Sequence, residues 1–350
     1  MAVKAEDLVI LLGAGCSADA GIPTATDMVT KIEVRLSQGD KEPLLKLYNY
    51  IKSALLFGRG IQGHFSSSLN IEDLLATLSE LEKKERNIIF PFIANWNDLL
   101  AQLAGPDFGL VSELKKLIND SLREWVRRDN YHQEAGYYLK FYNFQQEWQF
   151  PLRVFTLNYD QCFEKLAPTG VTLEQGFNEI SKKWQYQRFE PDDKRQVDIY
   201  LYKLHGSINW KRENDVLIHC DELVEDPELI FGLTGKLQSY DPYLFYVYEL
   251  RNYSLACKTI LVIGYGFGDE HINHLLRQAM QLSSHRTMVC VTGASSREDD
   301  ERSRICSVLG SPYNGRIRVH AINAKDFLNN QLSAQCIIDQ IPGADKGSPF

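Results

Sequence analysis

The sequence predicts an α/β fold: a Rossmann-like, doubly wound, mostly parallel sheet with a large all-helical insertion. Short apolar runs that are typical of buried strands alternate with helical stretches in much of the chain, the pattern of a parallel sheet. The first run passes directly into a glycine-rich turn. A long block after it has helical spacing instead. The strand-like runs cover residues 8–12, 152–157, 197–202, 259–263, 287–292 and 317–321.

The order of these signals predicts a discontinuous sheet domain. We expect the Rossmann-like domain to comprise residues 1–36 and 150–330, with a helical insertion or lid at 37–149 and a C-terminal tail at 331–350. Within the insertion, Asn70 precedes Leu74, Leu75 and Leu78 and is expected to cap a helix. The residues after Gly343 are small or polar and are expected to fray.

Composition narrows the class of protein. The 350 residues carry a formal net charge of −8 and 7 cysteines. An odd number of cysteines without a C-x-x-C pair disfavours a disulfide framework or a zinc ribbon and favours the reducing cytoplasm. The acidic balance does not favour nucleic acid as a partner. No apolar run reaches membrane-spanning length, and the first run is too short for a secretion signal, so we expect no membrane association.

The turn after the first apolar run fits the pattern G-x-G-x-x-G/A. Gly13, Gly15 and Ala18 hold its three positions. In dinucleotide-binding folds, such glycines allow a tight turn and a close approach of backbone to a pyrophosphate, next to a helix start. The alternative is a tight strand-to-helix turn without a ligand.

Polar or small residues also follow the later strands. Asn158 and Asp160 follow the second run, and His205 follows the third. Thr292 ends the fifth run, while Gly264 and Asp269 bracket a glycine-rich segment after the fourth. Because the carboxyl ends of parallel strands meet at one edge of a sheet, these residues are expected to line a cleft.

Each of these side chains has a functional and a structural interpretation. His205 has the chemistry of a general base, or it is a hydrogen-bonded histidine at a strand end. Asn158 and Asp160 could orient water or a ribose hydroxyl, or they form an Asx turn. His271 and His274 lack a third metal ligand at a suitable spacing, so we expect a solvated helix face and no metal.

Four motifs in order resemble the sirtuin superfamily, specifically its divergent branch in bacterial antiviral defence. They are Gly13-Ala14-Gly15-Cys16-Ser17 with Gly21-Ile22-Pro23, Thr156-Leu157-Asn158-Tyr159-Asp160, Leu204-His205-Gly206-Ser207, and Gly264-Tyr265-Gly266-Phe267-Gly268-Asp269 with Ile272-Asn273. The chain departs from sirtuin deacylases in three ways. It lacks their Phe-Arg pair after Pro23 and their four-cysteine zinc module, and Leu157 replaces a glutamine.

The resemblance implies a set of roles around NAD+. Asn158 would hold the nicotinamide ribose and the attacking water, Asp160 would support that site, and His205 would act as a base. Residues that would contact the rest of the dinucleotide are Gly13, Ala14, Gly15 and Ser17 at the diphosphate, and Gly264, Asp269 and Thr292 toward the adenosine.

The departures favour an NAD+ glycohydrolase that depletes NAD during phage infection, with NAD+ as its substrate. The alternatives are a sirtuin-like NAD or ADP-ribose sensor without turnover and an NAD-dependent protein deacylase. An activity that depletes NAD must be inactive in uninfected cells, so we expect it to be controlled by assembly. The expected partners are further copies of this chain in a homo-oligomer, or a HerA-like ATPase as in systems that this branch resembles.

Overall fold

The computed structural model describes residues 4–63, 69–83, 97–190, 195–222, 224, 227–229, 241–310 and 315–341. The chain forms two compact units. The sheet unit comprises Met1–Ile22, Arg127–Leu229 and Gln238–Phe350, and the helical unit comprises Pro23–Val126 and Ile230–Leu237. Among the described residues, no helix is long and apolar enough to cross a membrane.

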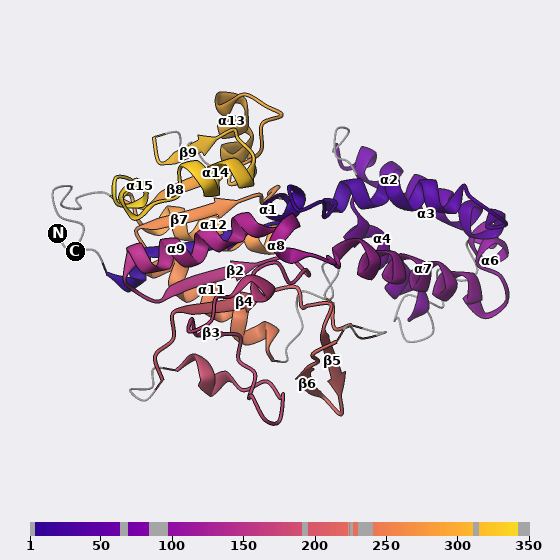
Figure 1. The fold of residues 1–350 in the computed structure, drawn as a ribbon. Helices are drawn as coiled ribbons and strands as arrows, with labels where there is room; N and C mark the ends of the chain where they lie inside the picture. Colours follow the sequence, from indigo (N-terminus) through magenta and orange to yellow (C-terminus); the bar gives the residue numbers. More distant parts are fainter. Residues whose placement is uncertain are drawn as a thin grey trace. The chain divides into compact units, whose positions relative to one another are not determined.

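The sheet unit is built on seven parallel strands in the order β3-β4-β2-β1-β7-β8-β9 (Figure 1). Their bounds are β1 Leu8–Leu12, β2 Leu152–Thr156, β3 Leu173–Glu174, β4 Ile199–Lys203, β7 Thr259–Ile263, β8 Thr287–Val291 and β9 Ile317–His320. The central strand β1 has Leu12 opposite Thr156 on one side and Ile263 on the other. This confirms the predicted parallel, doubly wound sheet.

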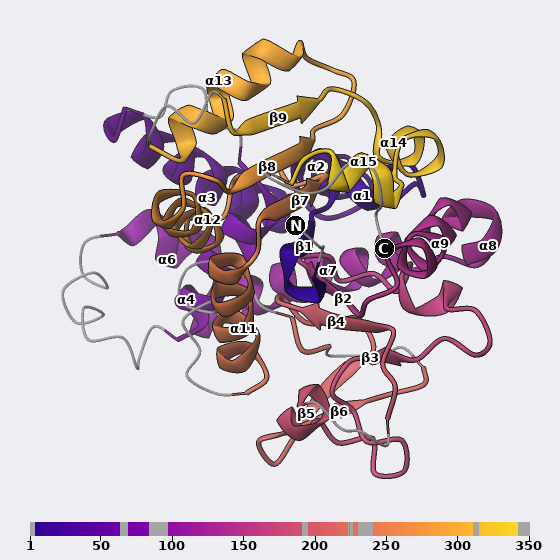
Figure 2. The ribbon, with the colours of Figure 1, turned by 90° about the vertical axis from the view of Figure 1, so that its left-hand side faces the viewer.

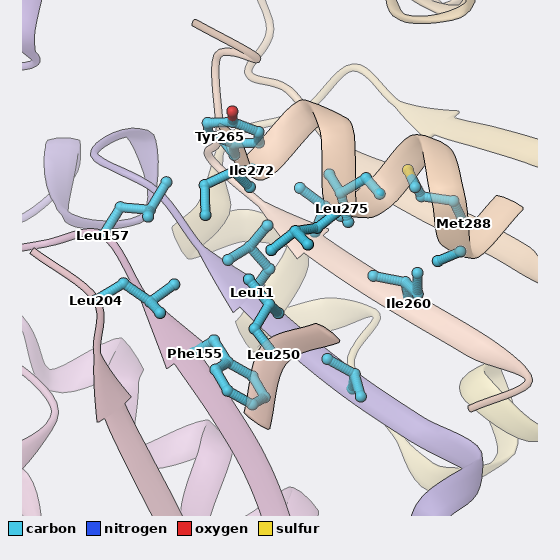
Figure 3. Packing of buried hydrophobic residues seen from close by; sticks show 14 of the residues in the cluster. Leu11, Phe155, Leu157, Leu204, Leu250, Ile260, Tyr265, Ile272, Leu275 and Met288 are labelled. Carbon is cyan, nitrogen blue, oxygen red and sulfur yellow. The ribbon is translucent and has the colours of Figure 1, made fainter. Parts of the chain in front are cut away.

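Helices cover both faces of this sheet (Figure 2). The helices of the sheet unit are α1 Gly15–Ala18, α8 Tyr131–Glu134, α9 Leu139–Trp148, α11 Tyr243–Ala256, α12 Glu270–Leu282, α13 Glu298–Val308, α14 Ala324–Asn330 and α15 Ala334–Ile338. Short 3₁₀ turns lie at η1 Ala5–Asp7, η4 Gly136–Tyr138, η5 Glu164–Leu166 and η6 Tyr186–Phe189. On one face, Leu11 and Phe155 pack with Leu250 of α11 and Leu275 of α12 (Figure 3).

The sequence of β1 explains its central place. All five of its residues are apolar and buried, as a strand covered on both faces requires. A separate two-stranded antiparallel hairpin, β5 Trp210–Glu213 and β6 Val216–His219, follows β4.

The helical unit contains α2 Ala25–Leu36, α3 Glu42–Ile61, α4 Ile71–Glu82, α6 Asp98–Ala104, η3 Pro106–Phe108 and α7 Gly109–Val126. Its core consists of the apolar faces of these amphipathic helices. Asn70 caps α4 as predicted, since its Oδ1 accepts the backbone N–H of Asp73 at 2.9 Å.

The boundaries of the two units differ from the expected ones at three places. Helix α2 belongs to the helical unit because Met28 and Ile32 pack into its core. Helix α9 belongs to the sheet unit, where it contacts α14 and α15. Residues 334–338 form α15 with Ile337 and Ile338 buried, so this part of the expected tail is packed. The segment after Gly343 lies outside the described residues.

Candidate functional site

The glycine-rich turns after β1 and β7 interlock. The backbone N–H of Gly13 donates to the carbonyl of Ile263 at 2.9 Å, and that of Gly15 to Gly264 at 2.8 Å. A Cβ on Gly15 would lie 2.8 Å from the Cα of Gly264, and one on Gly264 would lie 2.1 Å from the backbone nitrogen of Cys16. Gly264 also has a φ of +67°, which favours glycine. These glycines are therefore required by loop-to-loop packing.

The same bonds occupy the donors that we expected to face a negative ligand. Besides Gly13 and Gly15, Cys16 and Ser17 donate their N–H groups to the carbonyls of Gly13 and Ala14, at 2.9 and 3.1 Å. Within the described part of the chain, the N–H of Ala14 alone in this turn has no hydrogen bond to the protein. Most N–H groups of this turn are therefore already bonded to the protein and are not available to a negative ligand.

Ser17 is completely buried, and its hydroxyl has three protein partners. It donates to Oδ2 of Asp160 at 2.7 Å, accepts from Nδ2 of Asn158 at 3.0 Å and lies 2.7 Å from the hydroxyl of Tyr138. A hydroxyl donates once and accepts twice, so Tyr138 is the donor in the last contact. These bonds saturate Ser17. Its side chain supports Asn158 and Asp160, and the expected contact with a diphosphate stays a prediction.

The loop after β2 holds Asn158 and Asp160 in fixed orientations. Both residues are buried, with 8% and 5% of their surface exposed. Oδ1 of Asp160 accepts the N–H of Cys162 at 2.9 Å, the Asx turn that was one of the two interpretations. Oδ1 of Asn158 is buried and has no hydrogen-bond partner among the described residues. A buried acceptor of this kind marks a position where a ligand or water donates a hydrogen bond.

Two cysteines beside this loop are held as thiols. Burial, the largest influence, raises the pKa of Cys16 to about 12, and the charge of Asp160 acts in the same direction. Burial and Asp160 also raise the pKa of Cys162. Because the thiolate is the nucleophile, neither cysteine is suited to covalent catalysis at neutral pH.

His205 follows β4 and is 4% exposed. Its Nε2 lies 3.2 Å from Oδ2 of Asp269, which follows β7. In the sheet, β2 and β1 lie between β4 and β7, so this pair spans the carboxyl ends of the two central strands. The ring of Tyr159, next to Asn158 in the chain, lies 6.2 Å from the imidazole between ring centroids. The structure thus gathers the amide, the imidazole and the glycine turns at one sheet edge.

Thr292 lies at the end of β8, one strand further along the same edge. Its backbone N–H donates to the carbonyl of His320 at 3.2 Å, while its Oγ1 is buried without a partner in the described residues. The neighbouring β7 turn is attached to this strand, because Gly264 donates its N–H to the carbonyl of Val291 at 2.9 Å. Thr292 is therefore the outermost of the predicted positions.

The two helical histidines do not form a metal site with other residues described here. His274 is exposed, as expected for a solvated helix face, and its Nε2 lies 2.9 Å from Nε2 of Gln278. His271 differs from the expectation, because it is half-buried and its Nε2 is buried. No group of three potential metal-ligating side chains occurs among the described residues.

Sequence reasoning missed two supporting residues. Lys203, 1% exposed, donates from Nζ to the carbonyl of Asp160 and to Oε1 of Glu164, and so anchors the β2 loop. The sequence could have indicated Lys203, because a lysine at the end of an otherwise apolar strand needs a polar partner. Tyr138 gave no signal, because its contact to Ser17 joins residues that lie 121 positions apart.

One comparison with protein families matches part of the chain. Residues 152–309 match the family model of the SIR2-like domain. This segment contains Asn158, Asp160, His205 and Asp269. A search of the curated proteins found no match.

Solved structures that resemble the chain include several Sir2 proteins. One is a Sir2 homologue mutant in complex with 2′-O-acetyl-ADP-ribose (11% identity, TM-score 0.46, covering 97% of this chain and 94% of that chain). Another comes from a study of the mechanism and regulation of Sir2 enzymes (12%, 0.41, 94% and 91%). A third is Sir2 with a p53 peptide and NAD+ (13%, 0.40, 92% and 90%).

Proposed function

We propose that the chain hydrolyses NAD+ at the bond between nicotinamide and ribose, releasing nicotinamide and ADP-ribose. The observation that carries the proposal is the state of Asn158. Its Nδ2 is fixed by Ser17, while its Oδ1 is a buried acceptor without a protein partner among the described residues. An amide held in this way can orient one hydroxyl group or one water molecule.

The chemistry requires little more than this edge of the sheet provides. When the C1′–N bond breaks, its electron pair goes to the ring nitrogen, and nicotinamide leaves as a neutral molecule. The ribose passes through an oxocarbenium-like state, as in glycoside hydrolysis. The water oxygen then bonds to C1′ and loses a proton. His205 is suited to accept that proton, and Asn158 to aim the water.

The SIR2-like match over residues 152–309 supports NAD+ as the substrate, because it contains Asn158 and His205. Packing also explains why the glycine turn alone was a weak indicator. The glycines after β1 are required by the close approach of the turn after β7. The proposal therefore depends on the polar side chains.

The proposal is tested by incubating the purified protein with NAD+ and measuring the release of nicotinamide by chromatography. We expect Asn158→Ala and His205→Ala to lower kcat by about 10²-fold or more, as loss of a positioning or base group does. The matched control is His274→Ala, which removes an exposed histidine and should keep full activity. Folded Asn158 and His205 variants with unchanged rates would contradict the proposal.

The same assay separates the alternatives. Turnover that requires an acyl-lysine peptide would identify a deacylase, and binding of NAD+ without turnover would identify a sensor. In its biological setting, we infer that the hydrolase depletes NAD in phage-infected cells and is controlled by self-assembly or by a HerA-like ATPase. Light scattering that shows only monomers, with and without such a partner, would contradict control by assembly.

A further inference from the structure

We propose that Asp269 is a positioning residue that fixes the orientation and tautomer of His205. The effect of this pairing on catalysis rests on the proposed function, whereas the tautomer of His205 does not depend on it. The sequence-based expectation placed Asp269 on the adenosine side of the dinucleotide. In the structure its carboxylate contacts the imidazole.

The contact between the two side chains is buried on both sides. Nε2 of His205 lies 3.2 Å from Oδ2 of Asp269, and the side chains are 4% and 6% exposed. An ionised carboxylate only accepts hydrogen bonds, so Nε2 must carry the hydrogen. In the neutral ring, Nδ1 is then the basic nitrogen.

The carboxylate is held by the start of α12. Its Oδ1 accepts the backbone N–H groups of His271 at 3.0 Å and Ile272 at 3.4 Å. The amino end of a helix also stabilises a negative charge. Rotation of Asp269 away from His205 would uncap α12, so the helix determines where the second oxygen points.

The side chain of Tyr265 restrains the backbone of Asp269. The hydroxyl of Tyr265 lies 3.1 Å from the N–H of Asp269 and 2.9 Å from Oδ1 of Asn273. Asn273 in turn donates from Nδ2 to the carbonyl of Phe267 at 2.9 Å. The loop from β7 to α12 is therefore closed by its own side chains. A residue that served only as an N-cap would need one oxygen, whereas Asp269 uses the second on the imidazole.

These contacts predict a specific effect of Asp269→Asn. The asparagine can still cap α12 with Oδ1, which leaves its NH₂ group facing His205. An NH₂ group only donates, so Nε2 must become the acceptor and the hydrogen must move to Nδ1. We expect the tautomer to reverse while the fold is kept.

Long-range ¹H–¹⁵N spectra of protein labelled with ¹⁵N-histidine measure the tautomer directly. The His205 signals are assigned by their loss in His205→Ala. We expect Nε2–H in the wild type and Nδ1–H in Asp269→Asn, with kcat for NAD+ lowered about 10²-fold and KM nearly unchanged. The control is Asp27→Asn, which alters the exposed cap of α2 and should change neither reading.

A wild-type His205 with its hydrogen on Nδ1, or a tautomer that stays the same in folded Asp269→Asn, would overturn the proposal. Should Asp269→Asn not fold, Asp269→Ser keeps a capping oxygen but cannot reach the imidazole, and a mixture of tautomers is expected. A wild type with the Nε2–H tautomer but no nicotinamide release would overturn the hydrolase and keep the pairing.

Discussion

The amide of Asn158 donates a hydrogen bond of 3.0 Å to the hydroxyl of Ser17, joining the loops after β2 and β1. The same hydroxyl donates to Asp160, so one serine orients both polar side chains of the β2 loop. The serine of the first motif is thus a positioning residue for the β2 loop. Its effect on activity should depend on Asn158.

Ser17→Ala should lower both stability and activity. Removal of the hydroxyl leaves Oδ2 of Asp160 without a donor and Nδ2 of Asn158 without an acceptor, at a cost of about 1–3 kcal/mol. Because the amide is no longer held, nicotinamide release should fall by at least about 10-fold. Tyr138→Phe removes one donor and leaves the other two bonds, so it should have the smaller effect in both assays. Equal loss in the two variants would contradict this account.

Gly15→Ala should destabilise the sheet unit. The added Cβ would lie 2.8 Å from the Cα of Gly264, which is backbone and cannot move away cheaply. Overpacking of this kind costs about 1–3 kcal/mol. Gly58→Ala is the matched control, because it lies within α3 with nothing inside 4 Å of its added Cβ. It should stabilise its helix by about 0.5–1 kcal/mol. Thermal denaturation of the two variants should therefore shift in opposite directions.

The hairpin residue His219 should make stability depend on pH. Burial, and next the charge of Lys182, lower its pKa below the ordinary 6.5. Its Nε2 also lies 2.9 Å from Nδ2 of Asn209, a donor that suits the neutral ring. The unfolded chain binds the proton more tightly, so stability should fall as pH decreases from about 6.5 toward the folded pKa.

Thermal denaturation between pH 8 and pH 5.5 measures this effect. In His219→Gln the fall on acidification should be smaller than in the wild type, because the titrating ring is gone. His274→Gln replaces an exposed histidine and should keep the wild-type slope. A slope that is the same in all three proteins would show that His219 does not contribute.

The central strands were predictable because burial on both faces leaves an uninterrupted apolar run. β1, β7 and β8 lie within 8–12, 259–263 and 287–292, where the sequence places them. The polar residues that follow were readable for the same reason, since a parallel sheet brings its strand ends together. By this reasoning, His205 and Asn158 were predicted to lie at the same edge of the sheet.

Other elements lacked such a signal. Strand β3 has two residues, and β5 contains Lys211, Arg212 and Glu213, so neither shows an apolar run. Helix α2 has a clear apolar face, but periodicity does not tell which of two cores it joins. From the sequence, Asp269 was predicted only as a contact toward the adenosine. Its bond to His205 depends on strand order, which no local pattern gives.

The interlocked turns after β1 and β7 also constrain when the molecule can mature during synthesis. β1 leaves the ribosome first, but its neighbours begin at Leu152 and Thr259. At typical elongation rates, the nascent chain spends on the order of tens of seconds before β7 can dock. Asp269 emerges later still. A ribosome-bound chain therefore cannot bring Asp269 to His205 until more than two thirds of the 350 residues have been synthesised.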